Sequence, residues 1–313
     1  MIKKQSLPDH LHHRNKVKLS GWDIAFNIVN YTVLSLIMLA CLFPFYYLFI
    51  NTISSNELVR LGQIQLFPRD VHLENYVQVM KLNGIVDALL VSVARTVLGT
   101  AWTVAGCAFL GYLVTKREMW LRTLWYRLII ITMYFSAGLI PWYMNLRMLG
   151  FLDNFWVYVI PGLVSPYNVI LVKTFIEGVP TSLEESAMLD GAGYFRVFVS
   201  VIVPLITPIL ATLCIFSAVG QWNSFTDTMM LMPGGKYYTL QYLLYKYQHE
   251  AQSLASLMRS TQDTGAIGNL AIKQTALSVQ MTVAMVVVFP ILLVYPFFQR
   301  YFVKGIMIGA VKG

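Results

Sequence analysis

The sequence predicts an all-α membrane protein with six transmembrane helices. Of its 313 residues, 57% are hydrophobic and only 12% are charged, and the mean hydropathy is +0.61. A soluble chain carries about 25% charged residues, so a soluble domain of this composition would expose too much apolar surface to water. Six windows of at least 19 residues contain no Asp, Glu, Lys or Arg, and a membrane-spanning helix needs about 20 apolar residues. The windows are 24–56, 96–115, 128–146, 154–172, 197–226 and 274–299.

The first two windows also indicate where their helices begin and end. The first helix is expected to end near Ile50, because polar residues follow it. The second is expected to begin before its window, near Ala88, with Arg95 extending its guanidinium toward the membrane interface. Small residues share one face of this second helix and permit close approach of a neighbouring helix. They are Gly99, Thr103 and Gly106. Each of the other four windows predicts one further helix.

The distribution of Lys and Arg predicts the orientation. Six spans place both termini on one side, and the loops of that side carry 14 Lys and Arg over 73 residues, against 9 over 93 on the other. By the positive-inside rule, both termini are cytoplasmic. Residues 1–23 are then a cytoplasmic tail and residues 227–273 an extracytoplasmic segment. The net charge of +8 fits basic loops beside anionic lipid, so it indicates no nucleic-acid partner.

The sequence contains no motif for nucleotide binding, catalysis or metal binding. The Gly235-Lys236 pair is followed by Tyr237, so it is no phosphate-binding loop. We expect no catalytic residues and no metal site. The cysteines lie in apolar runs, and we interpret them as packing residues; they are Cys41, Cys107 and Cys214. If the protein moves a substrate uphill, the energy must come from another chain.

Residues 173–196 form a polar loop between the fourth and fifth windows, and the segment 177–204 runs from this loop into the start of the fifth window. Pro180 ends the preceding helix, and Ser182 and Glu185 stand at capping-box spacing for a new one. Gly191 falls where that helix would end with positive φ. A second apolar stretch leads to Pro204, near the start of the fifth span. This helix–turn–helix suits insertion into a groove on a partner, and a helix lying on the lipid surface is the alternative.

The same loop resembles a known family. Glu185-Ser186-Ala187 is followed by three residues and Gly191, then by nine residues and Val201, and after one more by Val203-Pro204. This spacing is similar to the EAA loop of binding-protein-dependent ABC importer permeases, whose pattern is Glu-Ala-Ala, three residues, Gly, nine residues, Ile, one residue, Leu-Pro. Asp190-Gly191-Ala192 matches the family's Asp-Gly-Ala core. The departures are small or apolar replacements.

Other stretches resemble the carbohydrate-importing permeases. Leu73-Glu74-Asn75-Tyr76 and Gln221-Trp222-Asn223-Ser224-Phe225 are similar to this subfamily. The tail 299–313 looks like that of the maltose-type permeases. The chain as a whole looks closest to the branch that imports polysaccharides and complex oligosaccharides, including the aldouronate-type permeases.

The resemblance implies a function and a set of partners. The chain would be a multi-pass permease of a bacterial cytoplasmic membrane, with a six-helix domain at 24–304 and a cytoplasmic tail at 305–313. It would assemble with a second, different permease, two ATPase subunits and an extracytoplasmic solute-binding protein, and it would pass an oligosaccharide. ATP and Mg would be used by the partner ATPases, and this chain would bind no cofactor. A membrane-embedded enzyme acting on lipid-linked sugars is the alternative, although no motif pairs the acids of the outer loops.

The resemblance also implies contacts with the ATPases. Glu185 would offer a charged hydrogen-bond partner, small residues would permit close packing, and Gly191 would make the turn. The coupling residues are Glu185, Ser186, Ala187, Asp190, Gly191, Ala192 and Pro204. The C-terminal tail would enter the ATPase dimer interface through Lys304, Gly305, Gly309 and Lys312. A disordered tail held near anionic lipid is the alternative for these last four.

A substrate path is expected among polar and aromatic residues within or near the ends of the spans. The candidates are Asn145, Tyr167, Asn168, Trp222 and Asn223. Such side chains stack on sugar rings and hydrogen-bond hydroxyl groups. Helix-to-helix hydrogen bonding is the alternative for Tyr167 and Asn168. The resemblance places the stretch around Trp222 and Asn223 near the translocation path. Trp142 and Tyr143 fit either sugar contact or an aromatic belt at the interface.

Overall fold

The computed structural model describes residues 20–81, 84–249, 277–294 and 296. Within them the regular secondary structure is helical and no strand occurs, which confirms the all-α class. The helices are α1 (Gly21–Thr52), α2 (Asn56–Arg60), α3 (Glu74–Lys81), α4 (Ile85–Leu113), α5 (Arg122–Tyr134), α6 (Leu139–Met148), η2 (Phe155–Tyr158), α7 (Pro166–Ile176), α8 (Thr181–Leu189), α9 (Tyr194–Val197), η3 (Phe198–Ile202), α10 (Val203–Leu205), α11 (Thr207–Asn223) and α12 (Thr226–Leu231). A helix at 240–249 and one at Leu277–Val294 follow.

Three described helices are long and apolar enough to cross a membrane. They are α1, α4 and Leu277–Val294, and a fourth is added if α9–α10 and α11 are counted as one bent span. Among the described residues, three of the six predicted windows are divided: the third, the fourth and the fifth, whose bend is described below. The third is interrupted after α5 at 135–138, where Gly138 has a φ of 92°. The fourth consists of η2 and α7 with a non-helical segment at 159–165 between them. The six-span count therefore stays a prediction.

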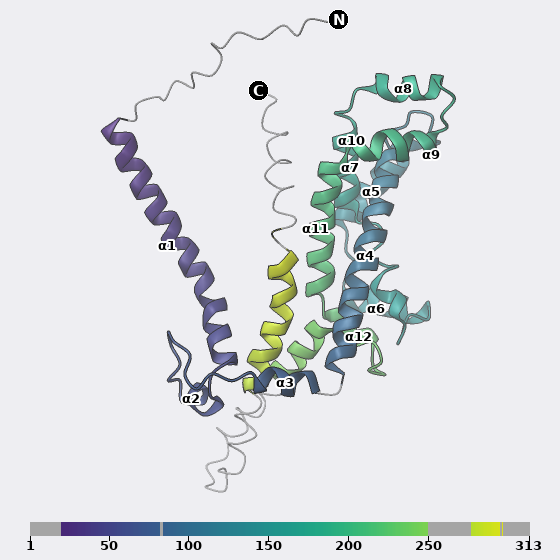
Figure 1. Cartoon of the computed structure of the whole chain (residues 1–313). Coiled ribbons are helices and arrows are strands. Elements are labelled where there is room, and N and C mark those ends of the chain that lie inside the picture. The colour runs from purple at the N-terminus through teal and green to yellow at the C-terminus, as the bar shows by residue number, and fades with distance from the viewer. Residues whose placement is uncertain (1–19, 82–83, 250–276, 295, 297–313) are drawn as a thin grey trace, which may run out of the picture.

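Helix α4 lies at the centre of the bundle and packs along α11 and α7 (Figure 1). Glycines allow this close approach. A Cβ atom added at Gly99 would lie 2.6 Å from Nε2 of Gln221, and one at Gly106 would lie 2.8 Å from the carbonyl oxygen of Leu163. At Gly111 it would lie 2.7 Å from a methyl group of Val172. The small face predicted for this helix is thus its packing face.

The fifth window bends sharply where it meets the polar loop. Residues Tyr194–Leu205 and the helix α11 meet at 82°, with Ile206 between them. Ile206 is fully buried in a core that also holds Tyr112, Val197 and Leu213. In Figure 1, α9 and α10 lie across the end of the bundle, α8 lies beyond them, and α11 runs along the bundle. Only the second part of this window is therefore oriented as a span.

Helix α1 stands apart from the other helices for most of its length (Figure 1). Its buried residues are the last three, Ile50 to Thr52. The predicted end near Ile50 lies two residues from the observed one. Two side chains of α3 hold this end: Asn75 donates to the carbonyl oxygen of Thr52 at 2.9 Å, and the hydroxyl of Tyr76 lies 2.8 Å from that of Thr52. The Asn-Tyr motif at 75–76 thus fastens the end of α1.

Candidate functional site

The polar loop folds as a short helix, a tight turn and a second helix. Helix α8 begins at Thr181 with Pro180 as its N-cap and without a side-chain cap, so the capping box predicted for Ser182 and Glu185 is wrong. Pro180 fixes its own φ and needs no N–H donor, so it starts the helix without a capping side chain. The C-terminal prediction is correct: Gly191 has a φ of 84°.

Hydrogen bonds show how this turn is built. The amide of Gly191 donates to the carbonyl of Met188 at 2.9 Å, and the amide of Ala192 donates to that of Ala187 at 3.0 Å. These two bonds form a Schellman motif, in which the residue after the cap adopts a left-handed conformation. Ala187 and Ala192 also pack against the apolar core beneath the loop. The turn therefore lies close to the bundle.

The remaining loop residues face outward. The side chains of Glu185, Ser186, Asp190 and Pro204 are exposed. Three apolar side chains beside them are exposed as well, with 44% of Leu183, 89% of Leu189 and 69% of Phe195 accessible. The loop thus presents an apolar and acidic surface, defined by Leu183, Glu185, Leu189 and Phe195, which we call the loop surface.

Helix α4 holds the loop surface in place. Lys116, just after α4, forms an ion pair with Glu184, and its Nζ lies 4.2 Å from the centre of the Tyr112 ring. The hydroxyl of Tyr112 donates to the carbonyl oxygen of Tyr194 at 3.3 Å. Both ends of the helix–turn–helix are therefore bound to the central helix.

A cavity of about 510 Å³ lies beside α4 on the way to the opposite end of the bundle. It is open to one side and is lined by α4, α6, α7, α11 and α12 together with the segment from η2 to Ser165. Its lining residues are Arg95, Thr103, Trp142, Val157, Tyr158, Pro161, Gly162, Ser165, Asn168, Phe216, Ser217, Gly220, Gln221, Ser224 and Asp227.

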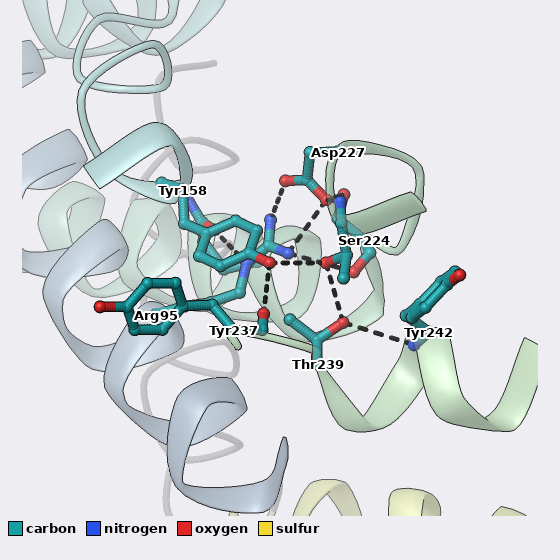
Figure 2. Close-up of polar contacts among 9 residues, drawn as sticks. Arg95, Tyr158, Ser224, Asp227, Tyr237, Thr239 and Tyr242 are labelled. Carbon is teal, nitrogen blue, oxygen red and sulfur yellow. Dashed lines mark hydrogen bonds and ion pairs between the residues drawn. The ribbon is translucent and has the colours of Figure 1, made fainter. Parts of the chain in front are cut away.

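The charged residues of the cavity form a buried ion pair (Figure 2). Arg95 binds both carboxylate oxygens of Asp227, at 3.1 and 2.5 Å, and its Nε donates to Gln221 at 3.0 Å. Only 4% of the Arg95 side chain is accessible. The prediction that Arg95 extends to the interface is therefore wrong, because a carboxylate 132 residues away and a glutamine on α11 satisfy the guanidinium inside the fold.

A chain of hydroxyl groups continues from this pair (Figure 2). The ring of Tyr158 lies 4.4 Å from the Arg95 guanidinium. Its hydroxyl donates to the carbonyl oxygen of Tyr237 at 2.6 Å and lies 3.0 Å from the hydroxyl of Thr228. Thr228 in turn lies 3.1 Å from Thr239. These contacts join η2, α12 and the segment before helix 240–249 at one edge of the cavity.

The non-helical segment 159–165 forms one wall of the cavity. Side chains of α4 and α11 take over some of the hydrogen bonds that a helix would supply to this region. Thr103 donates to the carbonyl oxygen of Gly162 at 2.8 Å, and Gln221 donates to that of Tyr158 at 3.2 Å. Irregular backbone at membrane depth is tolerated where it is buried in protein or lines a cavity.

The structure distributes the predicted path residues between different environments. Asn168 lines the cavity and is 8% exposed. Trp222 is 9% exposed, and its indole N–H donates to the carbonyl oxygen of Val287 at 3.1 Å. Asn145, Tyr167 and Asn223 are exposed and lie outside the lining. Contact of any of these residues with a substrate stays a prediction.

Some predicted residues lie outside the described part of the chain. They are Lys304, Gly305, Gly309 and Lys312, and the outer segment is described only as far as residue 249. Residue patterns also missed three members of the cavity, Arg95, Gln221 and Asp227. The sequence did hold one indication of the ion pair: Arg95 stands at the end of one predicted span, and Asp227 is the first acid after another, so the two could pair. Among the described residues, no three His, Cys, Asp or Glu side chains could hold a metal ion.

Comparison with known families decides the class. Residues 107–308 match the family described as the binding-protein-dependent transport system inner membrane component. The chain belongs to this family. It is a membrane transport component of a bacterial importer and not an enzyme, and its location is the cell membrane. Its family works with a solute-binding protein and an ATPase. The alternative of an enzyme acting on lipid-linked sugars finds no support.

Individual relatives agree over nearly the whole chain. The polygalacturonan/rhamnogalacturonan transport system permease protein YtcP of Bacillus subtilis is 32% identical, covering 92% of this chain and 98% of YtcP. Protein LplC of Bacillus subtilis is 31% identical, covering 92% and 95%. A chain in the crystal structure of a bacterial ABC transporter that imports the acidic polysaccharide alginate matches with a TM-score of 0.78 and 28% identity, covering 91% of this chain and 99% of that one.

Proposed function

We propose that this chain forms one half of the translocation path of an importer for oligosaccharides or polysaccharide fragments. A second, different permease forms the other half, and two ATPase subunits bind beneath them. The saccharide class is supported by the polysaccharides named for YtcP and for the alginate importer. The observation that carries the coupling mechanism is the loop surface, which is apolar, exposed and bound to the central helix through Glu184 and Tyr194.

The loop surface is the proposed ATPase contact. Leu189 is 89% exposed although it is apolar, so burying it against a partner removes apolar area from water. Glu185 adds an exposed carboxylate next to it, which suits a charged hydrogen bond. Gly191 keeps its proposed role of making the turn, whereas Ala187 and Ala192 pack against the bundle rather than toward the partner. ATP and Mg are used by the partner ATPases.

A matched pair of substitutions tests this contact. Leu189→Asp should remove ATPase subunits from the purified complex and abolish ATP hydrolysis stimulated by sugar-loaded binding protein. Met148→Asp, on another apolar side chain that is 83% exposed, should leave both unchanged. Normal assembly and stimulation in Leu189→Asp would contradict the proposed contact.

The proposed membrane arrangement has six spans within 24–304, cytoplasmic tails at 1–23 and 305–313, the loop 177–204 on the cytoplasmic side and 227–273 outside. Figure 1 supports it, because α8 and the first turn of α1 lie at one end of the molecule and α12 lies toward the other. Helices α5 and α6 are about 20 and 15 Å long, so neither alone crosses a hydrocarbon core of about 30 Å, and the third span needs both. Cysteines introduced at Leu189 and Met148 should be labelled from inside and outside, respectively, by an impermeant maleimide, and the reverse pattern would refute the orientation.

Helix α1 is the proposed contact with the second permease. Its apolar side chains are exposed along the helix, including Ile37 at 54%, because the described part of the chain offers it few contacts. A photo-crosslinking residue at position 37 should join the two permeases in membranes. Crosslinks to lipid alone would show that the bilayer covers this face.

The C-terminal tail is proposed to enter the ATPase dimer interface through Lys304, Gly305, Gly309 and Lys312. Support comes only from the likeness of the tail to maltose-type permeases. Deletion of 306–313 should weaken subunit association or abolish ATPase stimulation. Normal association and stimulation would favour a tail held at the lipid surface.

A further inference from the structure

One polar side chain of the cavity has no hydrogen-bond partner among the described residues. Asn168 is 8% exposed and lines the cavity, yet its side-chain amide forms no hydrogen bond with any residue that the structure describes. The fully enclosed, unpaired polar atoms of the described chain do not include those of Asn168, so its amide stays accessible from the cavity, where water or a ligand can bond it. The hydroxyl of Ser217, on the facing helix α11, is likewise unbonded within the described chain. Both groups therefore have hydrogen-bonding capacity to offer a ligand.

The other features of the cavity suit a sugar ring. Its volume of about 510 Å³ lies within the range of about 300–1,000 Å³ typical of small-molecule sites. The half-buried Trp142 gives it a flat aromatic surface. Polar groups placed beside such a surface match a saccharide, which has hydroxyl groups around an apolar ring face.

The charge of the cavity is cancelled internally. Arg95 and Asp227 are its charged lining residues, and they bind each other through two contacts. The Asp227 carboxylate accepts two further bonds, from the hydroxyl of Ser224 at 3.1 Å and the amide of Thr228 at 2.9 Å. A substrate carboxylate would have to displace this well-bonded group to reach Arg95.

We propose that this cavity is a saccharide subsite that binds hydroxyl groups through Asn168 and Ser217, stacks a ring on Trp142, and does not select for substrate charge. The proposal rests on the proposed function, since it places the subsite on this chain's half of the path. The carboxylates of an acidic sugar are then recognised by the binding protein and not by the permeases.

Direct binding to the complete complex tests the subsite. The two probes are trigalacturonate and its carboxyl-reduced, neutral counterpart, measured by saturation-transfer NMR with the complex in nanodiscs and without binding protein. The wild type should bind both with affinities that agree within about threefold. Asn168→Ala should weaken binding of both sugars at least fivefold. Thr174→Ala, a control at an exposed position of the same helix α7 outside the lining, should change neither by more than twofold.

A charge placed in the cavity gives a second readout. Ser217→Asp should weaken binding of the acidic sugar at least fivefold more than binding of the neutral one. Ser217→Asn should change the affinities for the two sugars by the same factor. The proposal is overturned if the wild type binds neither sugar or prefers the acid more than tenfold, or if Asn168→Ala changes binding no more than Thr174→Ala does. Hydrolysis stimulated by loaded binding protein is measured in parallel, because its absence in the wild type would refute the proposed function itself.

Discussion

Removing the charge of Asp227 should destabilise the fold strongly. In Asp227→Asn the guanidinium of Arg95 stays buried, since only 4% of that side chain is accessible, but its counter-charge is lost. Breaking a buried ion pair from one side costs about 3–5 kcal/mol. Asp227 is itself 15% accessible and Asn still accepts a hydrogen bond, so we expect the lower value, about 3 kcal/mol.

The expected loss can be measured as a melting temperature. For a large domain, 1 kcal/mol corresponds to about 2 °C, so Asp227→Asn should melt about 6 °C below the wild type. Thermal unfolding of the detergent-purified complex, followed by size-exclusion chromatography after heating, gives this number. Asp87→Asn, a carboxylate that the described ion pairs do not include, is the control and should shift the temperature by less than 1 °C.

A double substitution decides the cause. If the loss comes from the unpaired guanidinium, Arg95→Met combined with Asp227→Asn should be more stable than Asp227→Asn alone, because both charges are gone. A shift below about 1 °C in the single variant, or simple addition of the two single effects, would refute the reasoning.

Three further substitutions follow from the packing. Gly191→Val forces a β-branched residue to a φ of 84°, so it should destabilise the fold by about 1–2 kcal/mol. The variant should still insert into the membrane, but loaded binding protein should stimulate its ATP hydrolysis less. Gly191→Asn tolerates this φ and should have a milder effect, and equal activity of the two variants would contradict the proposed role of the turn. Gly106→Val places a side chain 2.8 Å from the carbonyl oxygen of Leu163 and should lower the melting temperature by several degrees, whereas Gly220→Ala, with open space around it, should not. Thr100→Val should leave the melting temperature unchanged or raise it, because no described residue bonds that buried hydroxyl. Thr103→Val should lower it by about 2 °C through the lost bond to Gly162, and the opposite order would show that the hydroxyl of Thr100 is satisfied.

Local patterns predicted the features that depend on local physics. Gly191 was identified as the end of α8 because a left-handed residue is needed there and glycine adopts that conformation without strain. The small face of α4 was recognised because Gly99 and Gly106 repeat at helical spacing, and the structure packs Gln221 and Leu163 against them. The end of α1 was placed within two residues because apolar residues give way to polar ones there.

Hydropathy windows could not reveal where the backbone breaks. The third and fourth windows are uniformly free of charge, and a count of charges cannot distinguish a continuous helix from two short ones. Gly138 and Pro161 lie in or next to the two breaks and are residue types that often interrupt a helix. Pro44, however, lies inside the unbroken α1, so a glycine or proline alone does not show where a helix is interrupted.

The candidate site was only partly predictable for a similar reason. Asn168 was selected from its residue type and span, and it lies in the cavity lining. The pairing of Arg95 with Asp227 joins residues 132 positions apart. No periodicity connects them, so α4 was expected to send its arginine outward.

The right-angled junction at Ile206 makes the two arms around it a rigid lever, in which movement of one arm turns the other. The arm Tyr194–Leu205 lies across the bundle and the arm α11 lies along it, at 82° to each other, and Ile206 is fixed in the core as the fulcrum. Helix α11 is about 26 Å long, so a rocking of about 10° about that fulcrum would swing its far end by about 4.5 Å. That end holds Gln221 and precedes Ser224, both in the cavity wall. A sideways push at one end of the molecule would thereby become a change in the width of the cavity.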